Sequence, residues 1–351
     1  EEHMKRSGKL LSTFVLASMV AVASPAFAAD SVTIKIQTSD RAGDETFRIQ
    51  KEEWAPKLEA MTNGRLKIEL FSDSQVVPRK ETIPAITAGV LGGHITSMEY
   101  HSGLEPGFAL LGNLVAGYNS PDQEQMFYFD GPGVALAQEG YDLVFGKGKI
   151  HVIGAGPYNR EAFVAKVPIR GVADMEGKKL RAPEGLVAEV FRRAGASTVT
   201  TPVSEVYTAL EKGVIDGADN SSYYNNRANG MNRIAPYPIW PGIHSQAVHS
   251  FVVSQKTWDS LTPDLQAALE VWWEWMYTKK RHVTDMNDRE LVALDKSGKG
   301  EKVEIVDWSL EERLKLRKIA EGAWLDFSKK SPFAEKVYNA HIEFMTKLAL
   351  L

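Results

Sequence analysis

Arg181 is the residue whose type and position carry the clearest chemical implication. It lies near the end of the predicted strand 178–183 (KKLRAP), and a predicted helix follows at 185–194. Ligands of open α/β sheets bind in the crevice outside the carboxyl ends of the strands. A guanidinium stays protonated in proteins, and its planar fork matches the two oxygens of a carboxylate. The sequence therefore predicts an anion-binding site at Arg181, with an internal ion pair to Glu184 or Glu205 as the alternative.

Enzyme signatures in the sequence are absent or incomplete. The segment from Gly140 to Lys147 is similar to a phosphate-binding loop, but five residues separate its glycines instead of four, and Gly148 stands where Ser or Thr would bind magnesium. His244 and His249 lie five residues apart, a spacing that suits neither one helix face nor one strand face. The chain also has no cysteine nucleophile. We therefore predict a binding protein and not an enzyme, with an exported enzyme on a two-lobed scaffold as an alternative.

Alternating strand and helix patterns must position Arg181. The stretch 32–39 (VTIKIQTS) alternates like a strand, a helical pattern follows at 47–61, and 63–71 is predicted to be the next strand. Two further strand–helix repeats run from 178 to 219. A mature chain of roughly 320 residues exceeds the size of about 250–300 residues at which a single hydrophobic core stops growing. These patterns predict an α/β protein with two lobes.

Two segments, the strand 151–166 and the proline-interrupted stretch 237–254, are predicted to pass from one lobe to the other. The helical pattern 261–298, which has Pro263 at its first position, predicts one very long helix or two abutting helices. We expect lobe I to comprise residues 29–157 and about 246–284, and lobe II residues 158–245 and about 285–351.

Residues 1–28 have the pattern of a secretory signal peptide. Basic residues precede an apolar run at 10–23, and Ala26-Phe27-Ala28 closes it in the manner of a cleavage site. Glu1–His3 precede Met4 and are interpreted as a cloning remnant. Because the apolar run is shorter than the roughly 20 residues that cross a bilayer, the sequence predicts a soluble protein exported to the periplasm.

The charge of the chain narrows the classes of partner, and its cysteine content narrows the sources of its stability. The chain has 45 acidic and 41 basic residues, which are interspersed and give a formal net charge of −4. No basic stripe is available for nucleic acid, so we expect no nucleic-acid partner. Since the chain has no cysteine, its stability must come from packing and not from disulfides.

Three motifs resemble the solute-binding proteins of TRAP (tripartite ATP-independent periplasmic) transporters. They are ADMEGKKLRAP (173–183), EVYTALEKGVIDGADN (205–220) and SLTPDLQAAL (260–269). The resemblance implies a two-lobed periplasmic binding protein fold of type II-like architecture, in which each lobe is a mixed sheet flanked by helices and a long helix spans both lobes. It also implies closure on a small organic acid and delivery to membrane permease subunits. A binding protein for another importer or a sensor is the alternative.

The resemblance also implies roles for particular residues. Arg181 matches the carboxylate-clamping arginine of the family, and Asp219 and Asn220 match an acidic-polar pair that lines the same cleft. Further candidates for the substrate site follow from their predicted positions at strand ends, hinge segments and adjoining loops: Glu99, Tyr100, Arg160, Tyr223, Trp240 and His244, with Glu161 as the alternative to Arg160.

The segment YPIWPGIHS (237–245) is similar to the α-keto acid binding branch of the family. It favours a keto, hydroxy or aromatic monocarboxylate as the ligand. That branch has Glu-Trp where this chain has Asp219-Asn220, and a glutamate where Ser245 stands. Fewer carboxylates mean fewer ligands for a hard cation. We therefore predict no cofactor and leave a substrate-bridging metal ion as the open alternative.

Overall fold

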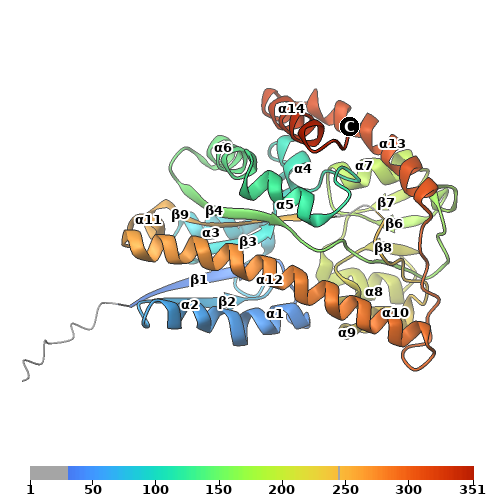
Figure 1. Ribbon diagram of the computed structural model, residues 1–351, viewed down its shortest axis with the longest axis horizontal. Helices are drawn as coiled ribbons and strands as arrows, with labels where there is room; N and C mark the ends of the chain where they lie inside the picture. Colours follow the sequence, from blue (N-terminus) through green and yellow to red (C-terminus); the bar gives the residue numbers. More distant parts are fainter. Residues whose placement is uncertain (1–30, 244–245) are drawn as a thin grey trace, which may run out of the picture. The chain divides into compact units, whose positions relative to one another are not determined.

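The computed structural model describes residues 31–243 and 246–351, so the predicted signal peptide lies outside the described residues. Two mixed β-sheets form the frame, one in each lobe (Figure 1). The first sheet has the order β2-β1-β3-β9-β4 and the second the order β5-β8-β6-β7. The strands are β1 (Val32–Thr38), β2 (Leu66–Phe71), β3 (Gly93–Ser97), β4 (Ile150–Pro157), β5 (Phe163–Ala165), β6 (Lys179–Arg181), β7 (Ser197–Val199), β8 (Gly217–Asp219) and β9 (Val248–Ser254).

Each sheet has a parallel centre with antiparallel additions. In the first sheet β1 pairs in parallel with β2 and β3, and β9 runs antiparallel between β3 and β4. In the second sheet β6 pairs in parallel with β7 and β8, and β5 is antiparallel to β8. The carboxyl ends of β1, β3, β6 and β8 are therefore the ends at which a ligand site is expected.

Short helices cover the first sheet. α1, a π-helical turn (Gln50–Trp54) and α2 run on as one helical segment, which buries Trp54 and Leu58 against β1. Ser120 caps α5 by accepting a hydrogen bond from the Gln123 amide. The helices of this part are α1 (Glu45–Ile49), α2 (Ala55–Met61), α3 (Thr82–Thr87), α4 (Gly107–Gly112), α5 (Pro121–Phe129) and α6 (Gly133–Phe145).

The second sheet carries its own helices. Gly185, which begins α7, has φ of +90°, and a Cβ there would come within 2.8 Å of the Ser102 hydroxyl oxygen, so glycine is required on both counts. Ser222 caps α9 by accepting from the Asn225 amide. The helices are α7 (Leu186–Arg193), α8 (Val206–Glu211), α9 (Tyr223–Ala228) and α10 (Met231–Ile234).

A single helix, α12 (Pro263–Lys296, 34 residues), spans both lobes. At 1.5 Å per residue it is about 50 Å long. Trp272 and Trp273 in its first half are buried in the core of the first sheet. Trp273 can approach β4 because Gly154 lies there, where a Cβ would be 2.5 Å from the indole. Val292 in its second half packs with the second lobe, so the predicted lobe-spanning helix is confirmed.

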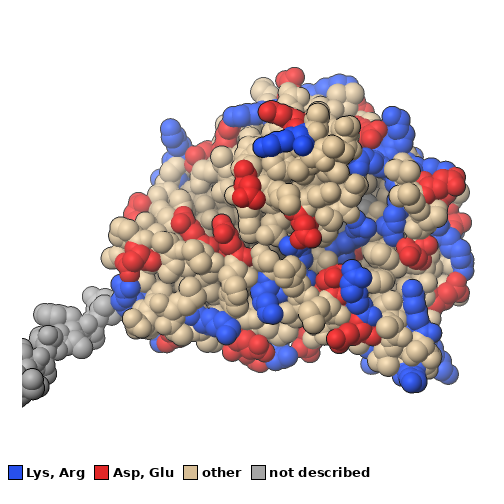
Figure 2. All heavy atoms as spheres, viewed as in Figure 1, with Lys and Arg blue, Asp and Glu red and all other residues tan. Residues whose placement is uncertain are grey.

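The C-terminal part is helical, as expected from its sequence. α13 (Leu310–Ser328) contacts both α7 and α4, and α14 (Pro332–Lys347) contacts α13 and α4. α11 (Gln255–Asp259) precedes α12. Among the described residues, no helix combines the length and the apolar character that a membrane crossing demands. The face drawn in Figure 2 mixes Lys and Arg with Asp and Glu, as the interspersed charges of the sequence predict.

Candidate functional site

A small cavity of about 40 Å³ lies where the carboxyl ends of the parallel strands of both sheets meet. The strand order brings these ends together although they are far apart in the sequence. It is lined from the first lobe by Ser39, Asp40, Arg41, Asp44, Glu99, Tyr100 and His249, from the second by Arg181, Pro183, Val203, Asn220 and Ser221, and from the segment that follows β4 by Tyr158 and Glu161.

Arg181 is a buried cation that backbone carbonyls hold in place. Its side chain is 3 % exposed; Nε donates to the carbonyl of Thr201 at 3.0 Å and Nη1 to the carbonyl of Asp219 at 2.7 Å. Across the described part of the chain, no carboxylate forms an ion pair with it, and Glu184 instead lies 3.5 Å from Lys80. The guanidinium is thus oriented without being neutralised, which is the state expected of a group that binds an anion from outside the chain.

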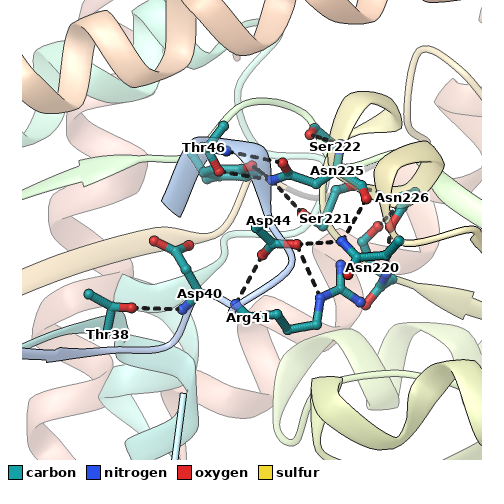
Figure 3. Close-up of polar contacts among 12 residues, drawn as sticks. Thr38, Asp40, Arg41, Asp44, Thr46, Asn220, Ser221, Ser222, Asn225 and Asn226 are labelled. Atoms are coloured by element: carbon teal, nitrogen blue, oxygen red, sulfur yellow. Dashed lines mark hydrogen bonds and ion pairs between the residues drawn. The ribbon is translucent and has the colours of Figure 1, made fainter. Parts of the chain in front are cut away.

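Arg41 supplies a second guanidinium from the opposite lobe. Its Nε lies 3.2 Å from Asp44 Oδ1, as Figure 3 shows. Nη1 and Nη2 are buried and make no hydrogen bond within residues 31–243 and 246–351. The sequence analysis missed Arg41, although it follows the carboxyl end of β1 just as Arg181 ends β6. The two arginines line one cavity from its two sides.

Polar side chains join the two lobes beside this cavity (Figure 3). Asn225 on α9 donates to the Thr46 hydroxyl at 3.0 Å and to the Tyr158 hydroxyl at 3.0 Å. Asn229 donates to Asp44 at 2.8 Å, which ties the partner of Arg41 to the second lobe. These bonds form only while the lobes touch, so they stabilise the closed arrangement that the structure has.

Asn220 is oriented so that its side-chain oxygen stays available as a hydrogen-bond acceptor. Its Nδ2 donates to Asn226 Oδ1 at 2.6 Å, which fixes the orientation of the amide. Its Oδ1 is buried and accepts no hydrogen bond from a described residue. The amide oxygen can therefore accept a hydrogen bond from a hydroxyl or amino group of a ligand.

Glu99 and Asp40 are buried acids in different protonation states. Burial, followed by the neighbouring Glu161, raises the pKa of Glu99 to about 8, although Arg181 opposes the shift. Glu99 is therefore protonated at neutral pH and can donate a hydrogen bond. Burial also acts to raise the pKa of Asp40, but the ammonium of Lys280, 2.8 Å away, outweighs it and the net shift is downward.

The other residues expected at the site lie in different surroundings. Arg160 donates to the Asn119 carbonyl at 2.7 Å and lines a separate cavity. Asp219 is buried at the end of β8 and contributes its backbone carbonyl to Arg181. The structure brings Arg181, Asn220, Glu99 and Tyr100 together, and it does not bring Arg160, Tyr223 or Trp240 to the same cavity.

Tyr223 and Trp240 bond to carboxylates of α12. The Tyr223 hydroxyl donates to Asp295 at 2.6 Å, and the indole of Trp240 donates to Asp288 at 3.3 Å. Both side chains therefore pack the long helix onto the second lobe. His244 lies outside the described residues, as does Ser245. Residues that the sequence analysis missed at the cavity, besides Arg41, are Tyr158, Ser221 and His249; Glu161, the alternative to Arg160, also lines it.

A metal site is not supported by the donor set. Within the part of the chain that the structure describes, no three His, Asp or Glu side chains lie close enough together to hold a metal ion. Of the cavity's acids, Asp40 pairs with Lys280 and Asp44 with Arg41. We therefore assign no role to a metal ion.

Comparison with known proteins places this chain in a family. The sequence model for bacterial extracellular solute-binding protein family 7 matches residues 41–330. A TRAP periplasmic solute-binding protein from Rhodobacter sphaeroides, solved in an apo open state, is 39 % identical; the match covers 91 % of this chain and 99 % of that one, with a TM-score of 0.72.

Two more distant matches agree with this assignment. A monocarboxylate 2-oxoacid-binding periplasmic protein of Nostoc sp. is 31 % identical over 55 % of this chain, and the match spans only about half of its own length (52 %). A TRAP solute-binding protein of Bordetella bronchiseptica, with copurified calcium and picolinate, shares the fold at 21 % identity, with a TM-score of 0.78 and coverage of 91 % and 93 %. The chain belongs to bacterial extracellular solute-binding protein family 7, the periplasmic solute-binding proteins of TRAP transporters.

Proposed function

We propose that this chain is the substrate-binding subunit of a TRAP transporter that captures a small monocarboxylate, of the keto, hydroxy or aromatic kind, and delivers it to the membrane permease. The observation that carries the proposal is Arg181, a buried guanidinium that two carbonyls orient and no described carboxylate neutralises. The Nostoc relative is named as a monocarboxylate 2-oxoacid-binding protein, which supports the same ligand class.

Closure of the two lobes lets the ligand make the contacts that favour its binding. A ligand that touches Arg41 on one lobe and Arg181 on the other makes contacts that an open form cannot make, so it shifts the population toward the closed form. The carboxylate loses its hydration, and the guanidinium groups replace those hydrogen bonds. Asn225 and Asn229 add bonds between the lobes that the same closure forms.

Glu99 adds no negative charge of its own to the cavity at neutral pH. Because Glu99 is protonated at neutral pH, it adds no repulsion to an incoming carboxylate and can donate a hydrogen bond to it or to an adjacent keto oxygen. The two guanidinium groups, of which Arg181 pairs with no described carboxylate, thus support an acid over a neutral sugar.

Native mass spectrometry of freshly purified protein tests the proposal directly. We expect a bound species whose mass corresponds to an organic acid and which is recovered unchanged after release. A thermal-shift screen of monocarboxylates, dicarboxylates, amines and sugars on ligand-free protein is the independent check. Stabilisation by amines or neutral sugars alone would contradict the proposal, and chemical turnover of the acid would favour an exported enzyme.

A further inference from the structure

A second, larger cavity opens beside Arg181. Its volume is about 510 Å³, and it shares Tyr100, Arg181 and Pro183 with the small cavity described above. The first lobe contributes His94, Thr96 and the loop around Arg79, and the second contributes Thr200–Pro202. A ligand whose carboxylate lies at Arg181 can therefore extend its remaining atoms into this space.

Several buried polar groups of this cavity have no partner within the chain. His94 is 1 % exposed and Thr96 is fully buried, and since they lie two residues apart on β3 they project from the same face. Both ring nitrogens of His94, the hydroxyl of Thr96, Nε2 of His101 and Nη2 of Arg79 make no hydrogen bond to any described residue. Buried groups of this kind are normally satisfied, so an outside partner is expected here.

The charge of these groups indicates what that partner is. Arg79 is already paired, because its Nε lies 2.8 Å from Asp73 Oδ1, and its guanidinium stacks on Tyr100 at 4.4 Å from the ring centroid. Burial, together with the nearby His101 and Arg79, lowers the pKa of His94 well below its usual range. Burial likewise lowers the pKa of His101 to about 4. Both imidazoles are therefore neutral, each with one donor and one acceptor nitrogen.

Hydroxyl groups match this lining better than the other candidate groups. Neutral imidazoles and a threonine hydroxyl both donate and accept, and a ligand hydroxyl does the same. An aromatic ring or an alkyl chain would leave the polar atoms without partners, at a cost of about 1–3 kcal/mol for each. A second carboxylate would find Arg79 and Lys80, which already pair with Asp73 and Glu184.

We propose that His94, Thr96, His101 and Arg79 form a second subsite that holds the hydroxylated end of a polyhydroxy monocarboxylate whose carboxylate is bound at Arg181. The inference rests on the proposed function and narrows its ligand from keto, hydroxy or aromatic acids to an acid with hydroxyls along its chain. Thr96 and His94 then contribute to ligand specificity through the hydroxylated end of the ligand, and Arg181 binds its carboxylate.

Calorimetric titration of the ligand-free full chain with a panel of aldonates and three other acids tests the subsite. The probes are a panel of four- to six-carbon aldonates, hexanoate, adipate and benzoate. We expect at least one aldonate to bind 30-fold or more tightly than each of the other three. If hexanoate, adipate or benzoate binds as tightly as every aldonate, the subsite inference is overturned while the proposed function stands. If no acid binds, the proposed function itself fails.

Two variants separate ligand contact from a structural role. Thr96→Val and His94→Leu should each weaken aldonate binding by about 3- to 10-fold, as expected for one lost hydrogen bond, and should leave hexanoate binding unchanged or tighter. Thr87→Val, an exposed position on α3 outside the cavity, is the matched control and should change neither. Equal losses for aldonate and hexanoate, or a lower unfolding temperature of the ligand-free variants, would overturn the assignment.

Discussion

Replacing Arg181 separates its role in binding from a role in folding. Arg181→Lys keeps the positive charge but cannot hold the carbonyls of Thr201 and Asp219 and grip a carboxylate at the same time. Losing one charge-assisted hydrogen bond costs about 1.5–3 kcal/mol, so we expect Kd to rise about 10- to 150-fold. Arg181→Met also removes the charge, at a cost of about 2–5 kcal/mol, and Kd should rise about 30-fold or more.

The stability of the ligand-free variant should change much less than its affinity. Removing a buried cation relieves a desolvation penalty of several kcal/mol, but it leaves the carbonyls of Thr201 and Asp219 without donors, at about 1–3 kcal/mol each. These two effects offset each other. Ligand at 100 times Kd stabilises the wild type by about 2.7 kcal/mol. At the same concentration a variant with 30-fold weaker binding gains only about 0.9 kcal/mol.

Isothermal titration calorimetry and thermal unfolding, both on protein stripped of ligand by unfolding and refolding, measure the two quantities. Arg192→Lys, an exposed position on the nearby helix α7, is the control and should leave Kd unchanged. An Arg181→Met protein that binds the acid within threefold of wild type would refute the clamp. So would a large drop in the unfolding temperature accompanied by an unchanged Kd, because that result would make Arg181 a structural residue.

Three further changes probe the surroundings of the site. Burial raises the pKa of Glu99 to about 8 from an ordinary value of 4.5. Between these two pH values the folded chain keeps a proton that the unfolded chain releases. The contribution of Glu99 to the free energy of unfolding therefore falls as the pH rises from 4.5 to about 8. Anion binding favours the protonated form, so Kd should increase between pH 7 and 9 in the wild type and stay flat in Glu99→Gln; parallel titrations for the two proteins would contradict this. Arg160→Lys should leave Kd unchanged by calorimetry, since Arg160 bonds to the Asn119 carbonyl in another cavity, and a tenfold loss would return it to the binding site. Lys280→Met should lower the free energy of unfolding, measured with urea, by about 3–5 kcal/mol because it leaves Asp40 as a buried unpaired charge; adding Asp40→Asn should recover part of the loss, and no recovery would count against the pair.

Much of the fold could be predicted because its signals are local. Alternation in 32–39 predicted β1. The helical pattern 261–298 predicted one long helix or two abutting ones, and the structure has the single helix α12. The expected crossing strand 151–166 is two strands in two sheets, β4 and β5, because the residues between them carry the chain across. A strand pattern does not reveal that break, since pairing in two different sheets is a tertiary property.

The candidate site was predicted in part. Arg181, Asn220, Glu99 and Tyr100 line the same cavity because strand ends are readable from the sequence and the parallel order of each sheet brings them to one edge. Arg41 had the same local signal after β1 but was missed, since its significance depends on the lobe that faces it.

The sequence by itself determined the order of strands and helices, the long helix and the position of Arg181 at a strand end, because spacings of two to four residues encode these features. Only the tertiary structure decided which polar groups lack partners. Tyr223 bonds to Asp295, 72 residues away, while His94 and Thr96 face an open cavity. The physical reason is that a side chain's hydrogen-bond partners lie wherever packing brings distant segments together, and no local spacing records that contact.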